Sequence, residues 1–229
     1  MDIEFVKKKK AHEVELVRAA VKSVACNYLG TTGLSYGMRE LPTGMSVIIK
    51  LPNNLKMDVR FFRNNYMESL AKLPFAIQTM IDAYQNSGIK YVRVRNTNSS
   101  LRWRPNGKSL KIMGDYYHNF SRRKPKVDNQ KQKIRTKMLI ERMQRFADDN
   151  LLFSEFFYDL KRIRNGVSLR VKMNYSKMLV FPVNINNYST IMPQIMNLIH
   201  SFEEPLSKIR GMNVQVSPCS HRDIWQNAA

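Results

Sequence analysis

Arginine alternates with apolar or aromatic residues on both sides of a short polar turn between residues 91 and 113. Arg93 and Arg95 stand in the segment YVRVR, and Arg102 and Arg104 stand in LRWR. Because successive side chains of a β-strand point to opposite faces, the two arginines of each segment share one face. Guanidinium groups bind phosphate oxygens through paired hydrogen bonds and stack on bases. The pattern predicts an arginine-rich β-ribbon on a nucleic-acid backbone, with an ordinary solvated sheet face as the alternative.

More basic residues follow this ribbon. Residues 105–107 are Pro-Asn-Gly, and Asn-Gly is a strong signal for a two-residue hairpin turn. Residues 121–135, SRRKPKVDNQKQKIR, carry one acid and predict a basic linker. The predicted nucleic-acid-binding residues are Tyr91, Arg93, Arg95, Arg102, Arg104, Lys108, Lys111, Arg122, Arg123, Lys124 and Lys126. The lysine run Lys7–Lys10 is a further candidate for phosphate contact, with a solvated terminus as its alternative.

The charge balance favours a polyanionic partner. The 229 residues include 38 Lys+Arg against 18 Asp+Glu, a net charge of +20. Like charges repel in the folded chain unless a partner neutralises them, so we expect nucleic acid, either DNA or RNA. No apolar run is long enough to span a membrane, and we expect no membrane partner. Two cysteines, Cys26 and Cys219, make no disulfide framework, which favours an intracellular location: cytoplasm or nucleoid, with nucleus or virion as alternatives.

The sequence resembles itself at an offset of 122 residues. GMSVIIKL (44–51) aligns with GVSLRVKM (166–173), NNYMESL (64–70) with NNYSTIM (186–192), and KYVRVR (90–95) with MNVQVS (212–217). Val17, Val21 and Val24, at helical spacing, align with Leu139, Met143 and Phe146. The pattern predicts a tandem duplication, with two unrelated segments of similar patterning as the alternative. The second copy replaces both arginines of VRVR by neutral residues, so the fold does not require them.

Each copy predicts the same order of elements. A helix (10–28; 130–148) precedes two strands (45–51 and 56–62; 167–173 and 177–183), a helix capped by an Asn-Asn pair, and a last strand (90–95; 212–217). The predicted fold class is therefore α+β: two tandem αββαβ modules that form a pseudo-dimer, with an inserted β-hairpin and a basic linker between them. Residues 1–96 would form the first module with a basic N-terminal arm. Residues 97–127 would form the hairpin and linker, 128–218 the second module and 219–229 a tail.

Groups suited to catalysis are sparse. Asp148, Asp149, Glu155 and Asp159 form one acidic concentration that could hold a metal for phosphodiester chemistry. Glycine loops for phosphate, nucleophile elbows and zinc-ligand spacings are absent from the sequence. We therefore expect no cofactor and no metal, and favour non-catalytic binding of nucleic acid. Two alternatives stay open: a structural component of a nucleoprotein or viral assembly with other proteins as partners, and a metal-dependent nucleic-acid-processing enzyme.

Overall fold

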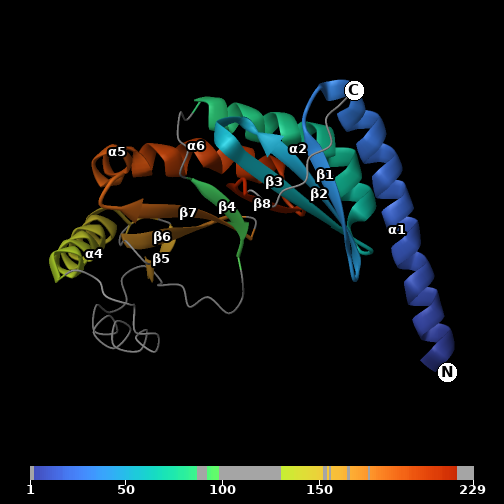
Figure 1. Cartoon of the computed structure of the whole chain (residues 1–229), viewed down its shortest axis with the longest axis horizontal. Helices are drawn as coiled ribbons and strands as arrows, with labels where there is room; N and C mark the ends of the chain where they lie inside the picture. Colours follow the sequence, from blue (N-terminus) through green and yellow to red (C-terminus); the bar gives the residue numbers. More distant parts are fainter. Residues whose placement is uncertain are drawn as a thin grey trace. The chain divides into compact units, whose positions relative to one another are not determined.

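The chain is an α+β protein with two four-stranded antiparallel sheets (Figure 1). The structure is a computed structural model that describes residues 3–86, 92–97, 130–151, 154, 156–163, 166–174 and 176–220. Its helices are α1 (Ile3–Thr32), α2 (Tyr66–Asn86), α4 (Gln130–Leu151), the short α5 (Tyr188–Ile191) and α6 (Ile195–Lys208). The strands are β1 (Tyr36–Leu41), β2 (Gly44–Leu51), β3 (Leu55–Phe62), β4 (Arg93–Asn96), β5 (Phe157–Ile163), β6 (Gly166–Met173), β7 (Lys177–Asn184) and β8 (Asn213–Pro218). The strand orders are β1-β2-β3-β8 and β4-β7-β6-β5.

Three strands, not the predicted two, lie between the first and second helix of each half. The additional strands, β1 and β5, each form an edge of their sheet and pair antiparallel with the next strand. The sequence did not predict them because adjacent charged residues, Arg39-Glu40 and Lys161-Arg162, interrupt the alternation that marks a half-buried strand. Edge strands tolerate such residues because one side of the strand has no neighbour to pack against. The order in the first half is therefore α-β-β-β-α-β.

A hairpin joins β2 to β3, as the segment Pro52-Asn53-Asn54 predicts. The two strands pair from Gly44↔Phe62 to Leu51↔Leu55. Asn53 and Asn54 have φ of 61° and 58°, which asparagine tolerates better than most residues. This tight turn fixes the register, and with it the side chains that share each face of the sheet.

The buried faces of α1 and α4 consist of apolar residues spaced four apart along each helix. On α1 the stripe is Val17, Val21, Ala25 and Leu29, and on α4 it is Leu139, Met143, Ala147 and Leu151. The sequence prediction assigned Val24 and Phe146 to these stripes. Val24 is 40% exposed and Phe146 is half-buried, because the buried positions are one residue further along in both helices. On α2 the buried stripe is Leu70, Leu73, Ile77, Met80 and Tyr84.

The Asn-Asn pairs act differently from the predicted helix caps. Asn65 Oδ1 accepts a hydrogen bond from the Phe62 amide at 3.1 Å, and Asn187 Oδ1 accepts one from the Asn184 amide at 2.7 Å. Both side chains therefore turn back to the end of the preceding strand. The backbone carbonyls of Asn65 and Asn187 instead accept the first helical hydrogen bonds. Each asparagine closes the turn between strand and helix, so it is structural.

The described residues divide into two compact units. The first takes residues from 1–96, 174–177 and 200–229, and the second takes residues from 97–173 and 178–199. Strand β8, which the sequence prediction placed in the second module, pairs with β3 in the first unit. Helix α1 begins at Ile3 and not near residue 10, so Lys8–Lys10 are exposed residues of a helix.

Candidate nucleic-acid interface

The first half of the predicted ribbon is strand β4. Val92 and Val94 are fully buried, whereas Arg93 is half-buried and Arg95 is exposed, so the predicted alternation of these four residues is confirmed. The Tyr84 hydroxyl donates to the Val92 carbonyl oxygen at 3.0 Å and ties the segment to α2. Burial, and then the charge of Arg95, lowers the pKa of Arg93. Two like charges therefore share one face of β4.

The rest of the predicted ribbon and linker lies outside the described residues. This holds for Tyr91, Arg102, Arg104, Lys108, Lys111, Arg122, Arg123, Lys124 and Lys126. Their contribution to binding stays a prediction from the sequence.

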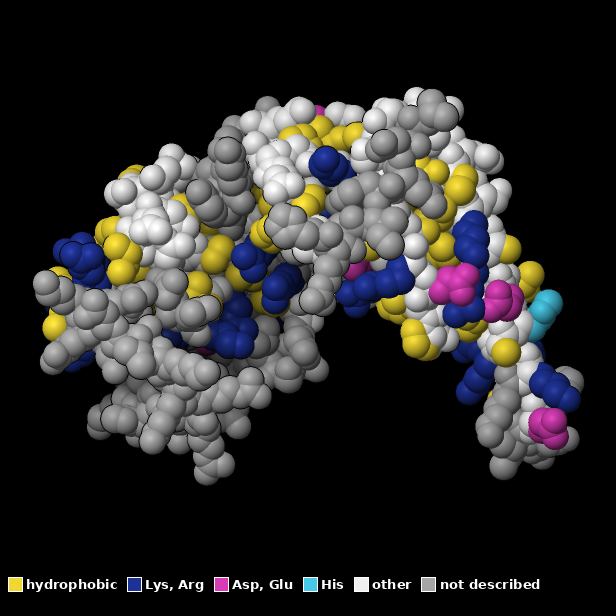
Figure 2. Space-filling view, viewed as in Figure 1, with side chains coloured by type: hydrophobic (Ala, Val, Ile, Leu, Met, Phe, Trp, Pro, Cys, Tyr) yellow, Lys and Arg dark blue, Asp and Glu magenta, His cyan; other side chains and the backbone are white. Residues whose placement is uncertain are grey.

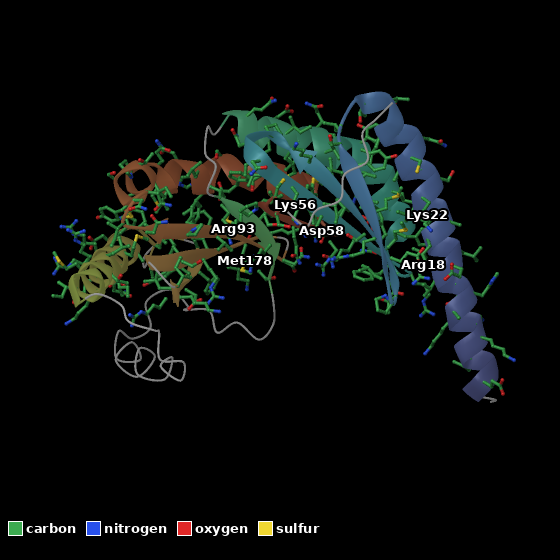
Figure 3. The ribbon with its side chains drawn as sticks, in the orientation of Figure 1. Arg18, Lys22, Lys56, Asp58, Arg93 and Met178 are labelled. Atoms are coloured by element: carbon green, nitrogen blue, oxygen red, sulfur yellow. The ribbon has the colours of Figure 1, made fainter. Side chains whose placement is uncertain are left out.

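The first sheet has one apolar and one polar face. Met57, Val59 and Phe61 of β3 are fully buried on the side that contacts α1 and α2. Lys56, Asp58 and Arg60 alternate with them and are half-buried. Figure 3 labels Lys56 and Asp58 on β3, together with Arg93 on β4. Because directly paired residues of an antiparallel sheet share a face, the register extends this polar face across all four strands.

Three rows of side chains make up this surface, which we call the sheet-A polar face. The first row is Arg39, Ser46, Arg60 and Asn213; the second is Gly37, Ile48, Asp58 and Gln215; the third is Lys50, Lys56 and Ser217. One acid thus lies between a row with two arginines and a row with two lysines. The sequence alone does not identify this surface. The alternation in LKMDVRFF (55–62) was the available signal, but the pairing of Arg60 with Arg39 through β2 depends on the register.

Asp58 holds the arginines of the first row. The Ser46 hydroxyl donates to Asp58 Oδ1 at 2.7 Å. Arg60 donates to Asp58 Oδ2 from Nη2 at 3.3 Å and from Nε at 3.4 Å, and Arg39 Nη2 lies 3.9 Å from the same oxygen. The side chains of Arg39 and Arg60 are 57% and 33% exposed, whereas that of Asp58 is 15% exposed. A single half-buried carboxylate therefore hydrogen-bonds one solvent-accessible guanidinium group and lies within ion-pair distance of a second.

Other cations of the first unit have structural roles. Arg18 donates to the Leu41 carbonyl oxygen at 2.7 Å and lies 3.4 Å from a carboxylate oxygen of Glu40, so it joins α1 to the end of β1. Lys22 donates to Glu40 at 2.8 Å, and these contacts lower the pKa of Glu40. Figure 3 labels Arg18 and Lys22 on α1, beside the first sheet. These two residues contribute to the net charge and at the same time join α1 to β1.

The second sheet carries basic residues at related positions. Lys161 and Ser168 are paired, as are Asp159 and Arg170, on one face of β5 and β6. Arg170 forms an ion pair with Asp159, and both side chains are largely buried. The Lys172 ammonium lies 5.3 Å from the centre of the Phe157 ring. On β5 and β6 the acid thus pairs with a single, poorly exposed arginine, whereas Arg93 and Arg95 lie on β4 at the other edge of this sheet.

The acidic residues 148–159 form hydrogen bonds within the fold. Asp148 Oδ1 accepts from the Tyr158 hydroxyl at 2.8 Å and from Gln144 Nε2 at 2.6 Å, which ties α4 to β5. Asp159 pairs with Arg170, and Glu155 lies outside the described residues. In the part of the chain that the structure describes, no three His, Cys, Asp or Glu side chains gather as metal ligands. The described contacts therefore give Asp148 and Asp159 a structural role, whereas Asp149 is exposed.

Basic side chains outnumber acidic ones on the face of the molecule that Figure 2 shows. None of the described helices combines the length and apolar character needed to cross a bilayer. Comparison with protein-family models, with curated proteins and with solved structures gave no match to this chain.

Proposed function

We propose that this protein binds nucleic acid without catalysis and contacts mainly the phosphate backbone. The observation that carries the proposal is the pair Arg93 and Arg95: two arginines alternate with buried valines, and no carboxylate among the described residues pairs with either. Like charges side by side on a strand destabilise it unless an anion neutralises them. A phosphodiester backbone supplies such anions at regular spacing, and guanidinium forks match phosphate oxygens.

We further propose that the chain is a tandem duplication whose halves form a pseudo-dimer. Strands β2 and β3 (44–51 and 55–62) recur as β6 and β7 (166–173 and 177–184), an offset of 122 residues at every end. The two apolar stripes and the two turn-closing asparagines recur at the same offset. In each sheet the fourth strand comes from the other half. These recurrences are difficult to reconcile with unrelated segments.

The internal repeat supplies the variant that tests the function. In the second half Gln215 and Ser217 stand where Arg93 and Arg95 stand in the first. We expect R93Q/R95S to fold normally, because it installs residues that the same type of strand already accepts. It should bind labelled oligonucleotides roughly ten- to thirty-fold more weakly at about 0.15 M salt, and the slope of log affinity against log salt should become shallower by about two.

The control for this test is K72Q/K208Q, which removes two charges that pair with Glu68 and Glu204 on the helices. Fluorescence anisotropy with single- and double-stranded DNA and RNA, between about 50 and 200 mM salt, gives the slopes. Absence of binding to all four probes by the wild-type protein would refute the proposed function. Equal loss in both variants would show that only net charge matters.

A further inference from the structure

We infer that the sheet-A polar face is a phosphate-binding surface for a nucleic-acid backbone, with Asp58 as the residue that positions Arg39 and Arg60. This inference rests on the proposed function and adds a second surface to β4. It concerns residues of the first unit only, all of them described.

Register brings the two arginines into one row. Arg39 pairs with Ser46, and Ser46 pairs with Arg60, so the arginines lie two strands apart, about 10 Å between their Cα atoms. The other members of this row, Ser46 and Asn213, are neutral, so Asp58 in the next row is the carboxylate that the described contacts give to these two guanidinium groups. Asp58 Oδ2 accepts from Arg60 and forms a longer ion pair with Arg39, while the Ser46 hydroxyl donates to its other oxygen. Arg60 is thereby held in place before any ligand arrives and Arg39 is attracted to the same carboxylate, which lowers the entropy cost of binding.

Charge remains after this pairing. One carboxylate faces two guanidinium groups, and each guanidinium carries five N–H donors, of which the described contacts use few. The exposed fractions of Arg39 and Arg60 leave these donors accessible to a ligand. Planar forks of this kind match the oxygens of a phosphate. The third row adds Lys50 and Lys56 on the other side of Asp58.

The composition of the face favours phosphates over bases. None of the described residues in the three rows is aromatic, and Phe62, the last residue of β3, pairs with Gly44 outside these rows. Base stacking needs aromatic platforms along the path of the strand, whereas phosphate contacts need cations and polar donors. Apart from Gly37, Ile48 and Asp58 of the second row, the rows hold Arg, Lys, Ser, Asn and Gln. We therefore expect this surface to bind with little sequence preference.

Three variants of the full-length chain test the inference. R39Q/R60Q should lower the affinity for a labelled oligonucleotide about tenfold or more and make the salt slope shallower by about two. D58N raises the net charge by one and keeps the shape of the side chain. If Asp58 positions the arginines, D58N should not raise the affinity for the oligonucleotide despite its extra positive charge. The affinity should fall, because the guanidinium groups lose the carboxylate that orients them. The control K72Q/K208Q should change the affinity less than either double-arginine variant.

The outcomes separate this inference from the proposed function. If the wild-type protein binds, R93Q/R95S weakens binding and R39Q/R60Q matches the control, the sheet-A surface is refuted and the proposed function stands. Tighter binding by D58N would refute the positioning role. Absence of binding by the wild-type protein to every oligonucleotide would refute both. Polyglutamate that competes as well as an oligonucleotide of equal charge would show that the face recognises acidic protein instead.

A measurement on the unmodified sequence covers the case in which R39Q/R60Q does not fold. Arginine side chains of the wild-type protein are modified with phenylglyoxal, with and without oligonucleotide, and the modified peptides are quantified by mass spectrometry. Arg39 and Arg60 should be protected by the oligonucleotide, whereas Arg145, an exposed residue of α4, serves as reference. Equal modification rates with and without oligonucleotide at Arg39 and Arg60 would overturn the inference.

Discussion

Lys177, the first residue of β7, is a buried cation held by neutral acceptors. Its ammonium donates to Asn96 Oδ1 at 2.5 Å and to the Met212 carbonyl oxygen, and Asn96 in turn donates to Asn213. Its exposed fraction is 3%. Burial lowers its pKa from 10.5 to about 8, because a charged ammonium loses its water there. The lysine connects the end of β4 to the start of β8, so its role is to join chain segments within the first unit.

The lowered pKa predicts a pH dependence of stability. Between pH 8 and 10.5 the unfolded chain binds the proton of Lys177 and the folded chain does not, so stability rises with pH, by about 3 kcal/mol from this group. In K177Q, which retains an amide donor, this rise should be absent. Urea unfolding at several pH values measures it, and the difference between the two proteins removes the contribution of all other groups. Parallel curves for wild type and K177Q would contradict the prediction.

Two glycines decide how closely the strands of each hairpin can approach. A Cβ atom at Gly44 would lie 1.9 Å from the Phe61 carbonyl oxygen, and one at Gly166 would lie 2.0 Å from the Val183 carbonyl oxygen. Both contacts are with backbone atoms of the paired strand, which cannot move without breaking the ladder. Glycine is therefore required at the start of β2 and β6, because the backbone of the paired strand lies too close for a Cβ atom.

Substitution of these glycines should weaken the sheets. We expect G44A and G166A each to lower the free energy of unfolding by about 2 kcal/mol or more, since overpacking against backbone is costly. The matched control is G30A in α1, where nothing lies within 4 Å of the added Cβ atom. G30A should be neutral or stabilise by up to about 1 kcal/mol, because alanine favours the helix. Chemical denaturation measures the free energy of unfolding of all three variants. Stabilities of G44A and G166A close to that of G30A would contradict the close-approach argument.

The excess of positive charge acts on the whole molecule. Many described ion pairs are short-range and exposed, such as Lys8 with Glu4 and Lys137 with Glu141, and contribute little to stability. A net charge of +20 leaves long-range repulsion that these pairs do not cancel. The free energy of unfolding should therefore be lower for the free protein than for the protein whose positive charges are neutralised by a bound polyanion.

Screening should raise the stability of the free protein. The screening length falls from about 30 Å at 0.01 M salt to about 8 Å at 0.15 M. We expect the thermal midpoint to rise over this range, in sodium chloride and in potassium chloride alike, because repulsion weakens with ionic strength regardless of the cation. Differential scanning calorimetry measures the midpoint. A midpoint that falls with salt would show that ion pairs outweigh the repulsion.

The sequence by itself determined much of the local structure. Period-two alternation located β2, β3, β6 and β7 within a residue or so of their ends, and helical spacing located α4 closely, whereas α1 begins at Ile3, well before the predicted start near residue 10. These patterns are local, because a strand or helix must bury one face whatever it packs against. The alternation of Arg93 and Arg95 with buried valines was predictable for the same reason.

Tertiary structure alone decided which strands complete each sheet and which cations share a surface. Strand β8 pairs with β3, and Arg39 lies in one row with Arg60 through β2, although these residues are far apart in the sequence. Pairing between strands depends on register and on long-range contacts, which the residues of one strand do not specify. The physical reason is that a period-two pattern fixes the face on which a side chain lies, whereas only the fold fixes its neighbours on that face.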